Sequence, residues 1–244
     1  MCCYLCCGKT KIKGNYMKIG IIFSGAGYGV YDALNILLNK NLLTKNEIKI
    51  LVSRNCIAYE RAIKENFTVR KIDFMDRDVF CIEAYNYFKD CNFVILNFGK
   101  IVTSELYSKI FTVNLHPSIL PSFKGANPLE DQLKNNVKFS GVTMHMVNGI
   151  LDSGKIISQC IIPVPYNSKI NFLKKVYYLG NCYNVLLIFD LMSRNYISVD
   201  LENDNFEYNT ILKFNTFSNP CLINKELEYE YQLLYDREIN NLWD

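Results

Sequence analysis

KIGIIFSGAGYG, residues 18–29, is a continuous apolar run followed by a loop with three glycines. An apolar run that stops at a small polar residue is typical of a buried strand, and residues 30–37 then carry apolar side chains at helical spacing. A strand, a glycine turn and a helix in this order form the opening unit of an α/β fold. This stretch therefore decides the fold class that we expect.

The same alternation continues to about residue 118. Further strands are expected at 48–53, 92–98 and 111–118, and the helical patterns between them at 58–67, 78–90 and 104–110. Strands separated by helices pair in parallel through right-handed crossovers. We therefore predict an open, doubly wound, mostly parallel sheet of Rossmann type.

The pattern changes after residue 137. Two strand-like runs, 139–147 and 155–164, are joined by the turn-rich segment NGILDSG, which predicts an antiparallel hairpin or a functional loop between two strands. A long helix is expected over 169–194 and a further strand pair within 196–214. The last stretch, 216–244, is polar and rich in aromatic residues but shows no periodicity.

Composition excludes several classes of function. Half of the 244 residues are apolar and 21% are charged, which is typical of a globular protein. The 27 basic and 24 acidic side chains are scattered, so we expect no nucleic-acid partner. The longest apolar stretch, 183–192, is interrupted by Asp190, which argues against a membrane span.

Ten cysteines are present, and four of them lie in MCCYLCCGK at residues 1–9. No signal peptide is recognisable, so we expect reduced thiols and a cytoplasmic protein. The four terminal cysteines have a spacing that permits metal binding or lipidation, but a second ligand pair is missing. We therefore expect no metal and interpret residues 1–16 as a Cys-rich extension.

The glycine loop at 25–29 does not fit a dinucleotide site. Val30 stands where that motif needs glycine or alanine, and residues 53–55 lack the acidic side chain expected after the second strand. The loop still opens a helix at the carboxyl end of a strand, where free backbone N–H groups favour an anionic substrate group. The alternative is that the glycines only permit a tight turn.

Four polar residues between positions 114 and 152 are candidates for chemistry. Asn114 and His116 alternate with apolar residues, so both side chains point to one side of a strand, at the end where open α/β sheets bind ligands. His145 lies in the next expected strand, and Asp152 follows it. A carboxylate beside an imidazole orients the ring and stabilises its charged form. The structural alternatives are a satisfied sheet residue for His145 and a turn residue for Asp152.

NLHPSILPSFKGANP (114–128), followed by GVTMHMVNGILDSGKIISQ (141–159), resembles the folate-dependent formyltransferases. KIGIIFSGAG and NFGKIV add to the likeness, which covers about residues 18–200. The resemblance implies a catalytic domain at 17–200, preceded by the extension at 1–16 and followed by a strand pair and tail at 201–244. It also implies an enzyme that uses 10-formyltetrahydrofolate as formyl donor.

The resemblance implies roles for named residues. Asn114 would donate a hydrogen bond to the oxyanion of a tetrahedral intermediate, His116 would manage the proton, and Asp152 would hold and polarise this arrangement. The folate would bind at Phe98, Gly99, Lys100, Ile101, Val102, Asn148, Gly149 and Leu151. The acceptor amine would enter beside Gly25, Ala26, Gly27, Tyr28 and Gly29.

The acceptor remains open between two classes. The purine enzyme, phosphoribosylglycinamide formyltransferase, typically continues its phosphate loop with Ser and Asn, which this chain lacks, and it carries Ala-His where Pro128-Leu129 stand here. Sugar N-formyltransferases resemble the chain in their altered loop and C-terminal addition, which favours a nucleotide-linked 4-amino-4,6-dideoxysugar, such as dTDP-4-amino-4,6-dideoxyglucose, for surface polysaccharide synthesis. Glycinamide ribonucleotide is the alternative. The likeness to the sugar enzymes also implies a homodimer.

Aromatic residues offer a further expectation. Tyr28 and the tail residues Tyr229, Tyr231 and Tyr235 are candidates for stacking on a nucleotide base, with core or dimer packing as the alternative. Two other functions are also weighed. A folate-formyl hydrolase shares the Asn, His and Asp pattern but carries a regulatory domain before its core, and a scaffold protein would keep the fold without turnover.

Overall fold

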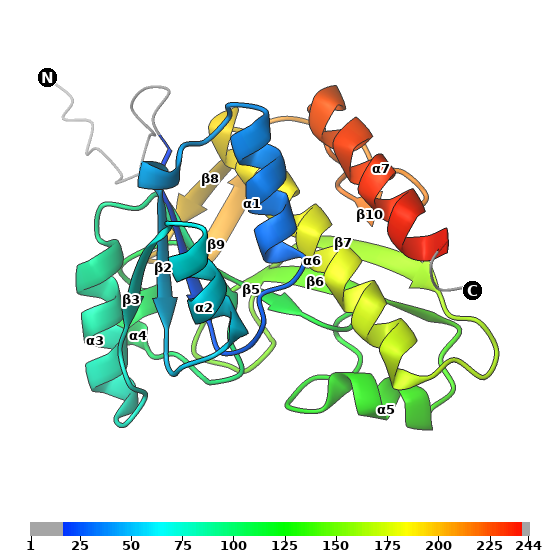
Figure 1. The fold of residues 1–244 in the computed structure, drawn as a ribbon, viewed down its shortest axis with the longest axis horizontal. Coiled ribbons are helices and arrows are strands. Elements are labelled where there is room, and N and C mark those ends of the chain that lie inside the picture. Colours follow the sequence, from blue (N-terminus) through cyan, green and yellow to red (C-terminus); the bar gives the residue numbers. More distant parts are fainter. Residues whose placement is uncertain (1–16, 241–244) are drawn as a thin grey trace, which may run out of the picture.

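The computed structural model describes residues 17–240 and contains one eight-stranded mixed sheet, in the order β10-β7-β6-β5-β4-β1-β2-β3 (Figure 1). Its strands are β1 Ile19–Phe23, β2 Ile48–Val52, β3 Thr68–Lys71, β4 Phe93–Asn97, β5 Thr112–His116, β6 Phe139–Met146, β7 Ile156–Pro163 and β10 Ser218–Asn219. The five strands from β5 to β3 are parallel, and β6, β7 and β10 run antiparallel to their neighbours. The Cys-rich extension at 1–16 lies outside the described residues.

Helices cover both faces of the sheet. One face carries α1 Val30–Asn39, α2 Ile57–Lys64, α6 Ile170–Ser193 and α7 Lys225–Asn240. The other carries α3 Arg77–Phe88 and α4 Ser104–Tyr107, and the shorter η1 Lys45–Glu47 and α5 Pro128–Lys134 lie in connections. Successive strand residues supply the two layers: Ile19 and Ile21 pack on the α1 side, and Ile22 on the α3 side.

The prediction of a doubly wound sheet is confirmed. The chain runs outward from β1 to β2 and β3, and α3 then returns it to β4 on the other side of β1. Two neighbouring strands therefore send their following loops in opposite directions, and the carboxyl ends of β1 and β4 border a crevice. In open α/β sheets this is where ligands bind.

The two predicted antiparallel pairs are also present. β6 and β7 form the hairpin, with a register shift between Met144 and His145. β8 Ile197–Asp200 and β9 Asn205–Tyr208 form a separate two-stranded sheet. The Tyr208 hydroxyl donates to the Ile157 carbonyl of β7, which fastens this small sheet to the large one.

The tail at 216–244 differs from the expectation, because residues 225–240 form α7 and Ser218–Asn219 form β10. Tyr231 lies buried on α7, and its ring packs against Tyr183 and Phe217. The edge strand β3 was also missed, since all of its residues are exposed or half-buried and give no apolar signal. None of the helices within residues 17–240 is long and apolar enough to cross a lipid bilayer.

Candidate active site

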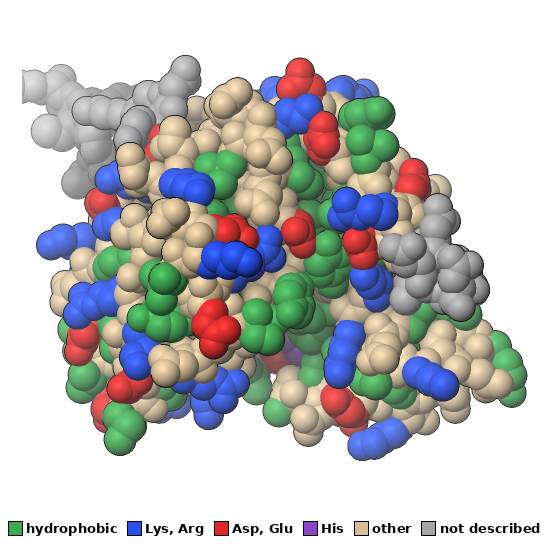
Figure 2. Space-filling view, viewed as in Figure 1, with side chains coloured by type: hydrophobic (Ala, Val, Ile, Leu, Met, Phe, Trp, Pro, Cys, Tyr) green, Lys and Arg blue, Asp and Glu red, His purple; other side chains and the backbone are tan. Residues whose placement is uncertain are grey.

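A cavity of about 1090 Å³ opens at the carboxyl ends of the parallel strands. Figure 2 shows it as a hollow with a histidine at its bottom. Its walls are the glycine loop after β1, the segment after β4, the β6–β7 connection and one side of α6. This volume is at the upper end for small-molecule sites, which leaves room for two ligands side by side.

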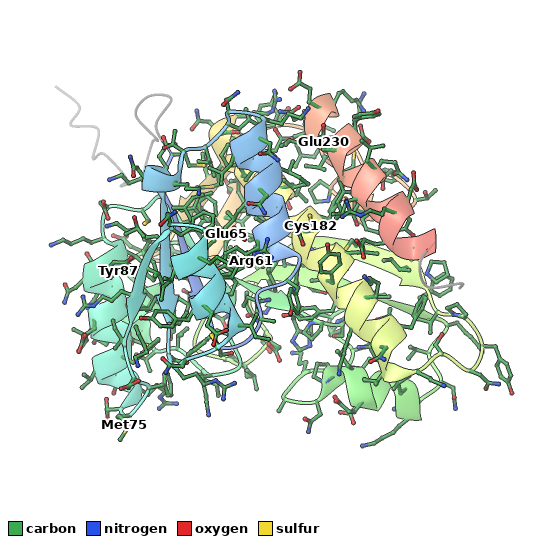
Figure 3. The ribbon with its side chains drawn as sticks, in the orientation of Figure 1. Arg61, Glu65, Met75, Tyr87, Cys182 and Glu230 are labelled. Carbon is green, nitrogen blue, oxygen red and sulfur yellow. The ribbon has the colours of Figure 1, made fainter. Side chains whose placement is uncertain are left out.

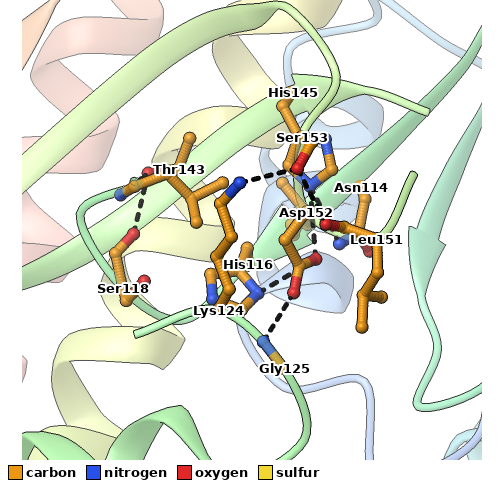
Figure 4. Close-up of polar contacts among 12 residues, drawn as sticks. Asn114, His116, Ser118, Lys124, Gly125, Thr143, His145, Leu151, Asp152 and Ser153 are labelled. Atoms are coloured by element: carbon orange, nitrogen blue, oxygen red, sulfur yellow. Dashed lines mark hydrogen bonds and ion pairs between the residues drawn. The ribbon is translucent and has the colours of Figure 1, made fainter. Parts of the chain in front are cut away.

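Asn114 and His145 are neighbours across the β5–β6 pair. The Asn114 Nδ2 atom lies 3.2 Å from His145 Nε2, and His145 Nδ1 lies 2.9 Å from the Met146 carbonyl oxygen (Figure 4). A carbonyl oxygen only accepts, so Nδ1 carries the proton and the Nε2 lone pair accepts from the Asn114 amide. His145 thereby fixes the direction of the amide, whose second N–H is available to a ligand.

Asp152 lies between the two histidines. Its Oδ1 is 3.4 Å from His116 Nδ1 and 3.7 Å from His145 Nε2, and its Oδ2 accepts a 2.8 Å hydrogen bond from the Gly125 N–H. The three side chains are almost fully buried. The structure thus brings the four candidates Asn114, His116, His145 and Asp152 together in the wall of the cavity.

The electrostatics of this cluster favour an ionised carboxylate. Burial alone would raise the pKa of Asp152, but the neighbouring imidazoles, His116 first, and the hydrogen bond from the Gly125 N–H outweigh it and hold the pKa well below its usual range. Asp152 also has a positive φ of 47°, a conformation that non-glycine residues rarely adopt. The chain is therefore bent locally to place a negative charge between two imidazoles.

The ring of His116 is held at both nitrogens. Nε2 donates to the Phe123 carbonyl oxygen at 2.8 Å, and Nδ1 faces Asp152. When the ring is protonated it donates from both nitrogens, so the site accommodates a positive charge beside the Asn114 amide. The arrangement therefore offers the Asn114 amide as a hydrogen-bond donor for a developing oxyanion. It also offers His116 and Asp152 as a pair that can accommodate the charge of a transferred proton.

The segments predicted for the folate line part of the cavity. They contribute Phe98, Gly99, Lys100, Ile101, Val102, Asn148, Gly149 and Leu151. The Phe98 ring stacks on Phe80 with centroids 5.5 Å apart, so it holds its own segment on α3. Ser24 Oγ accepts from the Gly99 N–H at 2.9 Å, which joins this segment to the glycine loop.

The glycine loop lines the adjoining part of the cavity, with one exception. Gly25, Ala26, Gly27 and Tyr28 face the cavity, whereas Gly29 does not line it. Gly29 caps α1 with a φ of 71°, and a Cβ there would lie 2.2 Å from the Tyr178 carbonyl oxygen. Its need for glycine is thus explained by the close approach of α6.

Sequence reasoning missed the part of the cavity wall that α1, α6 and α7 supply. Lys174, Lys175 and Tyr178 of α6, Asp32 of α1 and Glu238 of α7 all line the cavity. The helical spacing of apolar residues in α6 predicted which face of this helix is buried. Nothing in the sequence of the tail indicated that Glu238 lines the cavity. Tyr231 and Tyr235 pack against each other and do not line the cavity. Of the four tyrosines proposed for base stacking, all among the described residues, Tyr28 alone lines the cavity, and it is 53% exposed.

No group of three or more His, Cys, Asp or Glu side chains within residues 17–240 is arranged to hold a metal ion. The six cysteines in this range are free, and burial raises the pKa of Cys91 and Cys160 to about 12, so these thiols stay protonated at neutral pH.

Comparison with known proteins identifies the protein family. Residues 29–176 match the family model described as "Formyl transferase". The chain is 28% identical over 166 residues to the trifunctional purine biosynthetic protein adenosine-3 of Chironomus tentans, covering 64% of this chain and 12% of that protein. It is 33% identical over 125 residues to phosphoribosylglycinamide formyltransferase of Mycobacterium tuberculosis, covering 48% of this chain and 58% of that protein.

A solved structure shares the fold. Glycinamide ribonucleotide transformylase 1 from Symbiobacterium toebii superposes with a TM-score of 0.67 at 20% identity, covering 77% of this chain and 92% of that chain. The matches to the two sequence relatives span less than two thirds of the length of those proteins. The family match itself covers β4 to β7, and with them the four polar side chains of the site.

Proposed function

Because the chain belongs to the formyl transferase family, we propose that it transfers a formyl group from 10-formyltetrahydrofolate to the amino group of a phosphorylated small molecule. The observation that carries this proposal is the cluster of Asn114, His145, Asp152 and His116 at the centre of the cavity. The cavity is large enough for the donor and the acceptor together, and the cluster lies in its wall.

The reaction begins when the acceptor nitrogen attacks the formyl carbon. A carbon–nitrogen bond forms and the carbonyl becomes an oxyanion, to which the free N–H of Asn114 donates. The attacking nitrogen becomes positively charged and then gives up a proton; the Asp152 carboxylate stabilises the positive charge, and His116 takes part in the proton transfer. The bond from the carbon to N10 of the folate then breaks, N10 takes up a proton, and tetrahydrofolate and the formylated amine leave.

Two properties of the chain support a nucleotide-linked 4-amino-4,6-dideoxysugar as acceptor. Tyr28 presents an exposed ring at the mouth of the glycine loop, where a base can stack. The wall beside it is completed by α7, outside the family match. Glycinamide ribonucleotide is the second candidate, because the relative from Mycobacterium tuberculosis and the solved structure bear the names of enzymes for that substrate.

Purified protein should release tetrahydrofolate from 10-formyltetrahydrofolate with dTDP-4-amino-4,6-dideoxyglucose or with glycinamide ribonucleotide. Turnover of the sugar alone would support the first acceptor, and turnover of the ribonucleotide alone would support the second. Release of formate without an acceptor would instead indicate a hydrolase. No turnover of any of these, with bound folate detected, would refute formyl transfer to both acceptors.

A further inference from the structure

An ion pair between α6 and α7 forms part of the acceptor wall. Lys175 Nζ contacts Glu238 Oε2, and both residues line the cavity with side chains 27% and 16% exposed. Glu238 lies beyond the family match, which ends at residue 176. The carboxylate is therefore a feature of this chain's own C-terminal helix, which lies along α6 in Figure 1.

The pair continues into a row of alternating charges. Lys175 Nζ lies 4.9 Å from the centroid of the Tyr178 ring, and the Tyr178 hydroxyl donates to Asp32 Oδ2 at 2.8 Å. Asp32 in turn lies 3.8 Å from a guanidinium nitrogen of Arg61, which pairs with Glu65 (Figure 3). The row crosses the acceptor side from α7 to α2, and each of its cations has a carboxylate partner.

One cation of this wall stands apart from the row. Lys174 lines the cavity, and no carboxylate among residues 17–240 forms an ion pair with it. The glycine loop opposite offers backbone N–H groups at 25–28 that donate to no described group. This side of the cavity therefore attracts an anion, but Glu238 cancels half of the lysine charge on α6.

Glu238 remains ionised at neutral pH. Burial raises its pKa, but the hydrogen bond and charge of Lys175 and the nearby Arg237 guanidinium, 3.1 Å away, lower it by more. Its carboxylate pairs with the Lys175 ammonium, a group that also binds phosphate. A phosphate that reaches Lys175 has to compete with it.

We propose that Glu238 is a specificity-determining residue: it neutralises Lys175 in the free protein, and the phosphate group of the acceptor displaces it. This inference rests on the proposed function in taking the acceptor to be a phosphate ester. Displacing the carboxylate costs the free energy of its ion pair with Lys175. A phosphate replaces that interaction with its own, whereas a neutral ligand does not, so the site discriminates by the charge of the ligand as well as by its shape.

The test measures the binding of thymidine diphosphate and of ribose 5-phosphate by calorimetry at low salt. These ligands are chosen because their binding is measured without any turnover. Glu238→Gln keeps the shape and removes the charge, and we expect binding of at least one ligand to tighten about 3-fold and its salt dependence to steepen. Glu230→Gln on the same helix is the matched control, because Glu230 pairs with Lys40 at 2.7 Å and does not line the cavity. Glu230→Gln should leave binding unchanged.

Lys175→Gln separates competition from indirect effects. It should weaken binding, and the gain from Glu238→Gln in this background should differ from the gain in the wild-type background, because competition for the ammonium group is then absent and only the repulsion between carboxylate and phosphate remains. Unchanged or weaker binding of both ligands by Glu238→Gln, or an equal gain with Glu230→Gln, would overturn the inference. Absence of formyl transfer in the turnover assay would count against the proposed function alone, because this test measures binding only.

Discussion

Asp152→Asn is the sharpest test of the proposed mechanism. The substitution removes the negative charge that lies 3.4 Å from His116 Nδ1, while the amide oxygen keeps the hydrogen bond from the Gly125 N–H. A unit charge pair at about 4 Å is worth about 4 kcal/mol at the effective dielectric of a protein site. Because the positive charge is only partly developed in the transition state, we expect kcat to fall about 10²- to 10³-fold.

The assay is the release of tetrahydrofolate under saturating donor and acceptor. Folate affinity should stay within about 3-fold of the wild type, since the side chain of Asp152 is buried beneath the reaction centre. Ser153→Ala is the control: Ser153 accepts from Lys124 Nζ at 2.6 Å but touches neither histidine, so its kcat should change by less than about 3-fold. If Asp152→Asn retained more than about a tenth of the wild-type kcat with its fold intact, the electrostatic role would be wrong.

Three further outcomes follow from the geometry. Asn114→Ala removes the oxyanion donor and should lower kcat about 10²- to 10³-fold. His145→Leu keeps the amide but removes the hydrogen bond that orients it, and should lower kcat about 10-fold; both values are measured by tetrahydrofolate release. Leu227→Ala, at a fully buried position of α7, should lower the free energy of unfolding by about 2–5 kcal/mol, and Leu233→Ala, 50% exposed on the same helix, by less than about 1 kcal/mol, measured by denaturant unfolding. Because the pKa of Asp152 is depressed in the folded state, its contribution to stability is present above its ordinary pKa of 3.8 and is lost as the pH falls below it, so the stability difference between wild type and Asp152→Asn should shrink on acidification.

The parallel half of the fold was predictable because each signal is local. Residues 19–23 and 93–96 are buried on both faces, and such strands read as continuous apolar runs between loops. β3 gave no such signal, since it is an exposed edge strand that β2 alone pairs with. α7 was missed because its buried stripe, Leu227, Tyr231 and Leu234, is narrow and half of the helix is charged or polar.

The features of the site that depend on local sequence were predictable, and those that depend on long-range contacts were not. The alternation around Asn114 and His116 correctly indicated that both face the ligand side of one strand. The role of His145 depends instead on the register of β5 against β6, which places it opposite Asn114. An antiparallel register is set by the turn and the core packing together, so a single strand does not reveal its partner. The expected hairpin joins β6 to β7 and does not include β5, so it gave no signal for this contact.

Asp190 shows how the tail reaches the site. In the sequence it merely interrupts an apolar run, but in the structure its buried carboxylate accepts from the N–H groups of Ile223 and Asn224 at 2.8 and 2.7 Å, at the start of α7. Negative charge at a helix N-terminus is favourable, so α6 fixes where α7 begins. Sixteen residues then carry the helix about 24 Å along α6, which brings Glu238 to Lys175. Because each helical residue turns the helix by about 100°, one inserted residue between Leu234 and Glu238 would turn the carboxylate away from the cavity, so the acceptor wall depends on the length of α7 as much as on its composition.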